Sequence, residues 1–352
     1  MNYKETLFFV GKCLTITHED HNKTIVEKEI KSGNVDWDNV VKLSTAHYVF
    51  PALYCNLKRA NFLEYLPEEL VNYMKHITDL NRERNQQIII QAKEINELLL
   101  ANNITPIFLK GTGNLLEGLY EDIAERMVGD IDFIVSKDEY QKTISLFKKS
   151  GYENKIHILD NLKLGKHYPR LSNPKKIMAI EIHFKVIRDN YNKGLNFQTL
   201  IINSIKLDNK TSVLNKNYQL IHTVFNKQIN DFGYWHKTVS LRNTYDVYLL
   251  SYLTDTLHTF NVYKNYFKIS NGFLASVSFF LNSKKIKFER NPETNKFIKK
   301  QIKLIDNPKK MKWNKKKWDF YFNNKSRLRK LKISFQTKEM RIHFINLLKS
   351  NS

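Results

Sequence analysis

Residues 104–136 read ITPIFLKGTGNLLEGLYEDIAERMVGDIDFIVS, and this stretch determines the predicted fold. Its first part, ITPIFL (104–109), is an apolar run that is too short for a helix and rich in strand-forming residues, so it predicts a strand. Lys-Gly-Thr-Gly (110–113) predicts a turn, followed by a short helix over 114–119. GDIDFIVS (129–136) predicts a second strand, because acidic and apolar residues alternate along it.

Asp130 and Asp132 are separated by one residue on this second strand. Side chains two positions apart on a strand project from the same face, so the two carboxylates should lie close together. Because like charges repel, such a pair is typical of a site for a divalent cation. The alternative for a lone Asp-Ile-Asp is a strand edge that faces solvent.

A third predicted strand, IMAIEIHFKV (177–186), places Glu181 and His183 on one face. Glu181 would complete a set of three carboxylates for Mg²⁺, which keeps positions open for phosphate oxygens. A lone strand glutamate is otherwise solvated. His183 either orders Glu181 and contacts a substrate, or is an ordinary strand histidine with a satisfied hydrogen bond.

The turn between the first strand and the helix offers groups that bind anions. Gly111 and Thr112 would present backbone N–H groups and a hydroxyl at the N-terminus of the helix, where the helix dipole favours negative charge. Lys110 adds a positive charge for a triphosphate. The alternative for Lys-Gly-Thr-Gly alone is an ordinary turn.

The rest of the chain predicts an α+β protein in which a small core is embedded between helical regions. Apolar residues at helical spacing predict a helix that begins after an N-cap at Asp36, a long helix over 67–101 and a helix over 137–150 closed by Gly151. Further helices follow residue 217. We divide the chain into an N-terminal helical region (1–103), the core (104–200), a helical region (201–280) and a basic, aromatic-containing C-terminal segment (281–352).

The positive charge is concentrated in that last segment. The 352 residues carry a net charge of +22, and residues 281–352 hold 22 Lys and Arg against 5 Asp and Glu.

With 42% hydrophobic residues the chain has enough apolar content for a core, which excludes disorder throughout. Two cysteines, Cys13 and Cys55, cannot form a disulfide framework. No apolar run is long enough to span a membrane and no signal peptide is present, so we expect a cytoplasmic protein.

The order of these motifs resembles a known family. Apolar-Lys-Gly-Thr, then Asp-Ile-Asp between apolar residues, then apolar-Glu-apolar on a later strand resembles the nucleotidyltransferase superfamily that includes DNA polymerase β. The chain is most similar to the bacterial uncharacterised nucleotidyltransferases (NTP_transf_5-like) up to about residue 250. Thr112 stands where Gly or Ser is usual, and Glu181 where Asp is more common. The resemblance extends to a set of further positions: His47, Tyr120, Arg126, Gly151, Tyr152, His167, Tyr168, His183, His222, Arg242 and Asp246.

The resemblance implies a polymerase-β-like mixed sheet and a two-metal Mg²⁺ mechanism. Asp130, Asp132 and Glu181 would hold the metal ions, and the enzyme would transfer a nucleoside monophosphate from an NTP to an acceptor hydroxyl. Lys110, Gly111, Thr112, Arg126 and His183 would bind the nucleotide. Arg126 is equally compatible with an ion pair to Glu121 or Asp122, and Arg242 with one to Asp246. Nothing in the sequence assigns roles to His167, His222, Arg242 or Asp246.

The acceptor is indicated only by the basic C-terminal segment. Lysine clusters with interleaved Trp and Phe favour RNA, with tRNA as the leading interpretation. Lysines on solvated helix faces, with Trp313, Trp318 and Phe322 packed inward, are an equally good interpretation, and binding to a membrane surface is a weaker one. A protein-AMPylating enzyme and a non-catalytic RNA-binding protein with a degenerate core are the alternative functions. The resemblance also allows a role as a toxin or defence effector with an antitoxin partner.

Overall fold

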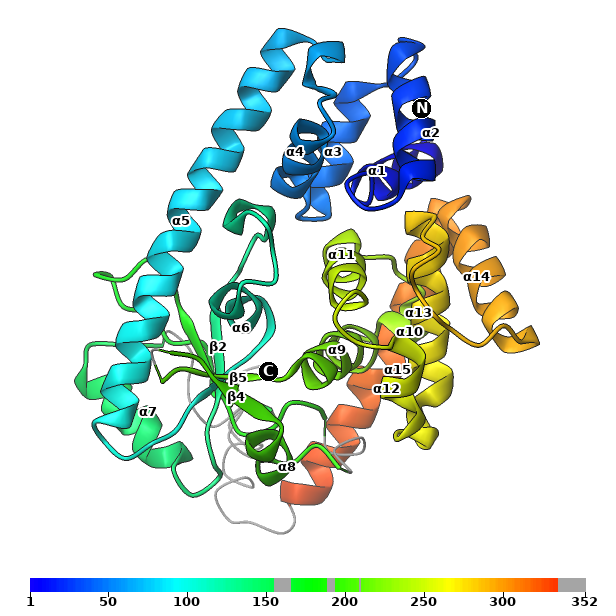
Figure 1. Cartoon of the computed structure of the whole chain (residues 1–352). Helices are drawn as coiled ribbons and strands as arrows, with labels where there is room; N and C mark the ends of the chain where they lie inside the picture. The colour runs from blue at the N-terminus through cyan, green and yellow to red at the C-terminus, as the bar shows by residue number, and fades with distance from the viewer. Residues whose placement is uncertain (155–165, 189–193, 209, 335–352) are drawn as a thin grey trace, which may run out of the picture.

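The computed structural model describes residues 1–154, 166–188, 194–208 and 210–334 (Figure 1). Five α-helices precede the sheet: α1 (Tyr3–Cys13), α2 (Asp20–Lys31), α3 (Trp37–Ala46), α4 (Phe50–Arg59) and α5 (Glu68–Leu100), with a 3₁₀ turn η1 (Leu63–Tyr65) before α5. Asp36 caps α3 by accepting a hydrogen bond from the Asn39 amide, as the sequence predicts. The long helix predicted over 67–101 is α5, which runs from the N-terminal helices to the sheet (Figure 1).

A mixed sheet of five strands forms in the order β3-β2-β1-β5-β4. Its strands are β1 (Ile107–Phe108), β2 (Ile131–Ile134), β3 (Ile180–His183), β4 (Ser204–Lys206) and β5 (Ser212–Leu214). β2 pairs in parallel with β3 and antiparallel with β1, whereas β5 pairs in parallel with β1 and antiparallel with β4. All three strands predicted from the sequence are present but shorter than predicted, and the sequence analysis missed β4 and β5.

The face of β2 opposite its aspartates packs against aromatic side chains. Phe133 lies 5.9 Å from Phe108 of β1 and 5.7 Å from Phe147 of α7 (Tyr140–Lys149), measured between ring centroids. Gly151 follows α7 with a φ of +81°, which suits glycine at the end of a helix. One side of β2 is therefore hydrophobic core, and the other is left for polar groups.

The helix after β1 begins earlier than predicted. The structure has α6 over Lys110–Glu117, so the expected turn is the first turn of the helix itself and the predicted range of 114–119 is wrong. A β-carbon on Gly113 would lie 2.8 Å from the carbonyl oxygen of Phe108, so only glycine lets the helix start this close to β1. Lys110 has a φ of +53°, a left-handed conformation that costs about 1 kcal/mol or more and is typical of functional sites.

The remaining helices are η2 (Ile123–Glu125), α8 (Phe197–Ile202), α9 (Lys216–Phe225), the π-helix η5 (Asn226–Asn230), α10 (Gly233–His236), α11 (Leu241–Leu250), α12 (Thr256–Asn261), η6 (Lys264–Tyr266), α13 (Phe267–Leu281), α14 (Pro292–Ile305) and α15 (Pro308–Ser334), where η2 alone precedes β2. Of these helices, those from α9 onward lie to the right of the sheet in Figure 1, and α8 lies below it. The chain is thus an α+β protein with a mixed sheet between helical regions, as predicted. In the part of the chain that the structure describes, no helix has the length and apolarity needed to cross a membrane.

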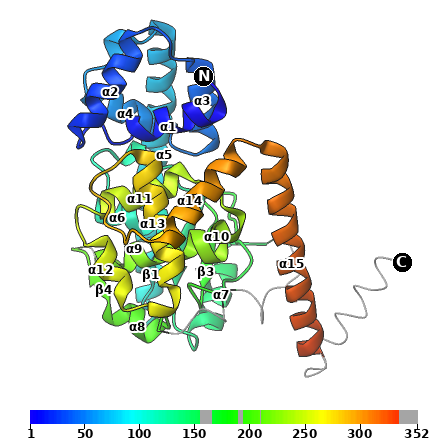
Figure 2. The ribbon, with the colours of Figure 1, turned by 90° about the vertical axis from the view of Figure 1, so that its right-hand side faces the viewer.

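α15 stands apart from the other helices. Figure 2 shows it as a long helix along the side of the molecule on which β3 and α7 lie. It packs against α10 and α14. Cys13 and Cys55, at the other end of the molecule, are both buried and free.

Candidate functional site

The three acidic residues singled out in the sequence lie on two neighbouring strands. Asp132 of β2 is directly opposite Glu181 of β3, because the two strands pair in parallel with these residues in register. Asp130 immediately precedes β2 and is two residues from Asp132, on the same face. One ligand atom each from Asp132, Glu181 and His183 lies within 4.8 Å of the other two, so these side chains can share one metal ion.

Lys110 neutralises this acidic group from the first turn of α6. Its Nζ lies 2.5 Å from Oδ1 of Asp132 and 3.5 Å from Oε2 of Glu181. Burial lowers the pKa of Lys110, but the charges of Asp132 and Glu181 outweigh burial and the pKa is raised above its ordinary value. The unusual φ of Lys110 therefore directs a charged side chain at the carboxylates.

His183 also contacts the carboxylates of Asp132 and Glu181. Its Nε2 is 2.8 Å from Oδ1 of Asp132 and 3.5 Å from Oε2 of Glu181, and its ring is fully buried. Burial raises the pKa of both acids, but Lys110 and His183 outweigh burial, so both pKa values are lowered. Asp132 and Glu181 are thus held in the ionised form that a metal ion requires.

A segment before β3 adds two residues to the site. Residues His167 and Leu171 form antiparallel bridges to His183 and Ile180, which lays this segment along the free edge of β3. His167 Nε2 lies 4.0 Å from Oε2 of Glu181, and Nη2 of Arg170 lies 2.5 Å from Oδ1 of Asp130. The sequence analysis missed Arg170, because only strand pairing brings it to Asp130.

Lys166 and His222 lie near the same acids. Lys166 is partly buried, which lowers its pKa to about 8, and its Nζ donates to Oδ1 of Asn226 at 3.1 Å. His222, on α9, has a pKa lowered well below its ordinary value by burial and by the charges of Lys110 and Lys166. Its Nε2 has no hydrogen-bond partner among the described residues. The site therefore brings His167 and His222, which had no role in the sequence analysis, beside the acidic group.

Thr112 and Gly111 lie inside the protein. The Thr112 hydroxyl donates to the backbone carbonyl of Asp130 at 3.1 Å, which ties the start of α6 to the start of β2. A β-carbon on Gly111 would contact Val128 at 3.1 Å and the Arg126 guanidinium at 3.4 Å. Both residues therefore pack α6 against the segment that carries Asp130.

Arg126 takes part in a separate buried cluster. Its Nε donates to both carboxylate oxygens of Asp246, at 3.0 and 3.1 Å, and Asp246 also accepts from the Tyr120 hydroxyl at 2.8 Å. The alternative pairing of Arg126 with Glu121 or Asp122 is wrong, since these acids pair with Arg59 and Arg82. The Arg242 guanidinium donates to the carbonyl of Met127 at 3.3 Å. The Arg126–Asp246 pair joins two residues that are 120 positions apart in the sequence.

The donor set fits a divalent cation. Two ionised carboxylates and a third, Asp130, on one face supply the oxygen ligands that Mg²⁺ prefers, and they leave the remaining positions to water or phosphate. The pKa of Asp130 is raised by burial and by the charge of Glu181, which means that the acidic charges repel one another at this face. A cation with two charges would relieve that repulsion.

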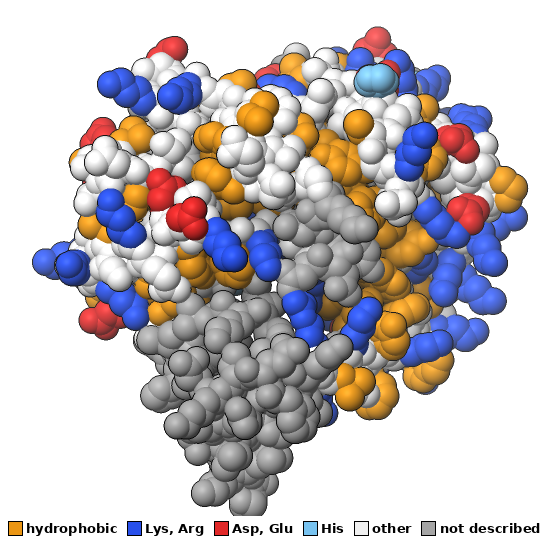
Figure 3. All heavy atoms as spheres, turned by 90° about the horizontal axis from the view of Figure 1, so that it is seen from below, with side chains coloured by type: hydrophobic (Ala, Val, Ile, Leu, Met, Phe, Trp, Pro, Cys, Tyr) orange, Lys and Arg blue, Asp and Glu red, His pale blue; other side chains and the backbone are white. Residues whose placement is uncertain are grey.

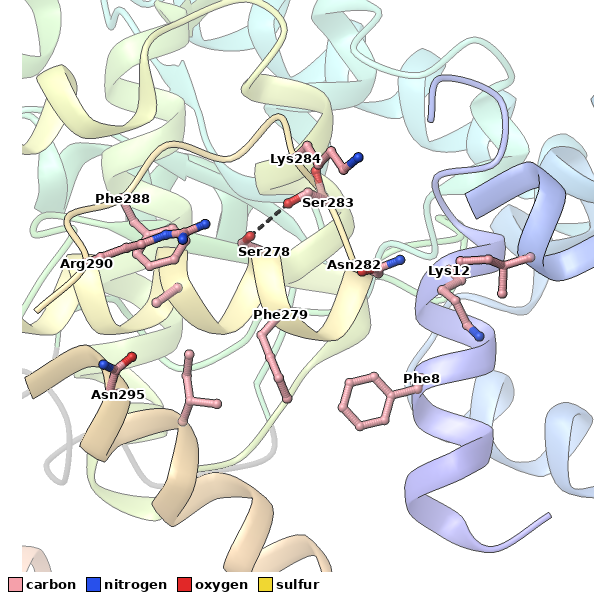
Figure 4. A pocket seen from close by; sticks show the side chains of 13 residues that line it. Phe8, Lys12, Ser278, Phe279, Asn282, Ser283, Lys284, Phe288, Arg290 and Asn295 are labelled. Atoms are coloured by element: carbon pink, nitrogen blue, oxygen red, sulfur yellow. Dashed lines mark hydrogen bonds between the residues drawn. The ribbon is translucent and has the colours of Figure 1, made fainter. Parts of the chain in front are cut away.

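A separate hollow of about 660 Å³ lies where the N-terminal helices meet α13 and α14 (Figure 4). Figure 4 shows Phe8 of α1 pointing toward Phe279 of α13, with Lys12 on the same helix as Phe8. None of the residues that line this hollow belongs to the acidic group. We therefore assign the chemistry to the strands and not to this hollow.

The sequence of the chain matches one known protein family. The family of uncharacterised nucleotidyltransferases, NTP_transf_5, matches residues 33–261. The chain belongs to this family. The matched range begins before α3 and ends with α12, so it contains the whole sheet, the three acids, Lys110 and His183, whereas α13, α14 and α15 lie outside it. As a member of the family, the chain is a nucleotidyltransferase.

Among solved structures, the chain is similar to an antigenic nucleotidyltransferase-like protein from Paracoccidioides brasiliensis. The two share 13% sequence identity with a TM-score of 0.34, over 58% of this chain and 95% of the other. A comparison with curated proteins gives no match.

Proposed function

We propose that this nucleotidyltransferase transfers a nucleoside monophosphate from an NTP to an acceptor hydroxyl in a Mg²⁺-dependent reaction. The observation that carries the proposal is the in-register pair of Asp132 and Glu181 on parallel strands, with Asp130 on the same face. Acids gathered in this way favour a bound divalent cation, because neighbouring like charges cost free energy unless cations compensate them.

Asp130, Asp132 and Glu181 would hold the metal. Bound Mg²⁺ would neutralise triphosphate charge and favour the attacking hydroxyl and the leaving pyrophosphate. Lys110, which the metal would displace from Asp132, lies at the N-terminus of α6 and is placed to bind the triphosphate. Arg170 is half exposed beside Asp130 and supplies a second positive charge.

The chemistry is a substitution at the α-phosphorus. The acceptor oxygen forms a bond to this phosphorus, the bond to the oxygen that bridges to the β-phosphate breaks, and pyrophosphate leaves. The hydroxyl proton passes to water. Glu181 has a pKa well below its ordinary value, because its hydrogen bond with His183 and the charge of Lys110 outweigh burial, so Glu181 is suited to bind a metal and not to retain this proton.

RNA is the acceptor that we propose. The C-terminal segment carries the excess positive charge, and polyanions bind to such segments with release of counterions. Figure 3 shows lysine and arginine side chains gathered on the right-hand side of the lower face, where the C-terminal helices lie in Figure 1. No described contact favours a protein acceptor.

The proposal is tested by labelling. The full chain is incubated with each α-³²P-labelled NTP, Mg²⁺ and either total RNA or total protein. We expect label in RNA, no label in the presence of EDTA, and no label with Asp132→Asn. Asp138→Asn is the matched control, because Asp138 is an exposed acid six residues further along the chain. Label in protein would identify an AMPylating enzyme, and no label in any pool would contradict the proposal.

A further inference from the structure

The outer face of α15 carries a stripe of basic and aromatic side chains. Residues that point away from the protein recur at steps of three and four along the helix, which places them on one face. We define this stripe as Lys309, Trp313, Lys316, Phe320 and Arg327, all of which are exposed. The exposed fractions are 65% for Trp313 and 70% for Phe320, which is unusual for such large side chains.

The opposite face of α15 fixes the helix to the protein. Phe322 stacks on Phe232 with ring centroids 3.9 Å apart, and Asn314 donates to the carbonyls of Trp235 and His236 at 3.2 and 3.0 Å. Asp319, the one acid between residues 308 and 329, lies 3.0 Å from Nε2 of His236. The outer stripe therefore contains no negative charge, and no contact with another described part of the chain holds it against the body.

The segment from Asn226 to Phe232, which α15 contacts at Phe232, also borders the candidate active site. Asn226, at the start of η5, accepts a hydrogen bond from Lys166, whose neighbour His167 lies 4.0 Å from Glu181. η5 ends two residues before Phe232, on which α15 stacks. The guanidinium of Arg188 lies over the ring of Phe232, 4.4 Å from the ring centroid. Two cations, Arg188 and Lys166, thus lie beside the segment of residues 226–232, which α15 contacts at Phe232.

We propose that the outer stripe of α15 binds single-stranded RNA and guides its 3′ end toward Asp132 and Glu181. This inference rests on the proposed function for the hydroxyl that reacts. Trp313 and Phe320 are seven residues apart, about 10 Å along the helix, so they can stack on separate bases while the lysines between them contact phosphates. Unpaired bases offer faces for stacking, whereas the bases of a duplex are already stacked.

A protein partner fits the stripe less well. A helix that pairs with another helix presents apolar side chains at every third and fourth position. On α15 the corresponding positions alternate between aromatic and basic residues, since Lys316 lies between Trp313 and Phe320. Lys317 already lies over the Trp313 ring, 5.6 Å from its centroid, which shows that cations and aromatic rings share this surface.

The test measures RNA binding separately from catalysis. Fluorescence anisotropy is recorded on the full chain carrying Asp132→Asn, with a labelled 12-nucleotide single strand, a hairpin of equal length and an anionic vesicle as probes. We expect the single strand to bind most tightly, and Trp313→Ala and Phe320→Ala each to weaken it about tenfold. Tyr73→Ala on α5 is the control for an exposed aromatic residue and should have no effect.

A second variant tests the basic residues of the stripe. Lys309→Gln, Lys316→Gln and Arg327→Gln together should lower the slope of log affinity against log salt by about 2, because three phosphate contacts are lost. The control changes three exposed lysines of α3, α4 and α5: Lys42, Lys58 and Lys93. Circular dichroism should show unchanged folding in every variant, since all the substituted side chains are exposed.

The outcomes separate this inference from the proposed function. Unchanged affinity in the Trp313 and Phe320 variants, equal affinity for the hairpin, or binding only to vesicles would overturn the inference. If single-stranded RNA binds as expected but the wild type labels no RNA, the stripe binds RNA, whereas its role in guiding a 3′ end and the proposed acceptor are both wrong. If labelling persists after the stripe is removed, α15 does not select the acceptor.

Discussion

Two clusters of charged residues lie near β2, and they differ in what surrounds them. In one, Arg126, Asp246 and Tyr120 are buried and bonded to one another. In the other, Asp132 and Glu181 share the single ammonium of Lys110, and Glu181 and Lys110 remain partly exposed. The first cluster has one acid for one base, whereas the second concentrates acids at the edge of solvent.

The difference separates structure from chemistry. The buried ion pair of Arg126 with Asp246 holds α11 against the segment before β2. An acidic group whose cations, Lys110 and Arg170, are partly exposed and displaceable gains from binding a metal. This comparison assigns Arg126 to the structural cluster, although the sequence alone placed it among nucleotide-binding candidates.

The largest effect is expected from the acidic group. Asp132→Asn should lower the labelling rate by at least about 1,000-fold, because a metal ligand supplies several kcal/mol of transition-state stabilisation. The thermal unfolding midpoint should change little, since an asparagine still accepts hydrogen bonds from Lys110 and His183. Rates from labelled NTP and unfolding followed by circular dichroism measure the two effects. A large drop in stability would instead place Asp132 in the structural group.

The buried pair should show the opposite behaviour. Arg126→Met should lower the free energy of unfolding by about 3 kcal/mol, because it leaves the Asp246 carboxylate buried without the cation that compensates its charge. The double variant Arg126→Met with Asp246→Leu should recover much of this loss. Urea denaturation measures both values. Arg82→Met, which breaks a partly exposed pair with Asp122, should cost less than about 1 kcal/mol. A raised KM for NTP with unchanged stability would return Arg126 to the nucleotide site.

Lys110 links metal and nucleotide binding. Lys110→Met should increase the affinity for Mn²⁺ in the absence of nucleotide about tenfold, because the ammonium and the metal compete for the same oxygen of Asp132. The same change should raise the KM for NTP. Electron paramagnetic resonance of free Mn²⁺ measures the first effect. Lys137→Met, an exposed lysine after β2, serves as the control, and weaker Mn²⁺ binding in Lys110→Met would contradict the competition.

The smallest effect is expected at Thr112. Thr112→Val should cost about 1 kcal/mol in stability and slow labelling, because the carbonyl of Asp130 loses its hydrogen-bond donor. Thr112→Ser keeps the hydroxyl and should restore both. If the Thr112→Val and Thr112→Ser variants are equally stable but only Thr112→Val raises the KM for NTP, the hydroxyl contacts phosphate as the sequence predicted.

Local patterns were enough to predict much of the fold. The helix over 67–101, the cap at Asp36 and the three core strands follow from periodicity and capping residues that lie within a few positions of one another. β4 and β5 were missed because each is three residues long and gains its stability from pairing, not from its own pattern. The start of α6 was placed too late because glycines normally indicate a turn, whereas Gly113 allows close packing on β1.

The sequence by itself placed Asp130 and Asp132 on one face, because the period of a strand fixes which side chains share a side. It also concentrated positive charge in the last 72 residues, since charge is additive along a chain. Only the tertiary structure brought Glu181 opposite Asp132, Arg170 to Asp130 and Asp246 to Arg126. Those contacts join residues between 40 and 120 positions apart, and such distances are closed by strand register and helix packing, which no local pattern encodes.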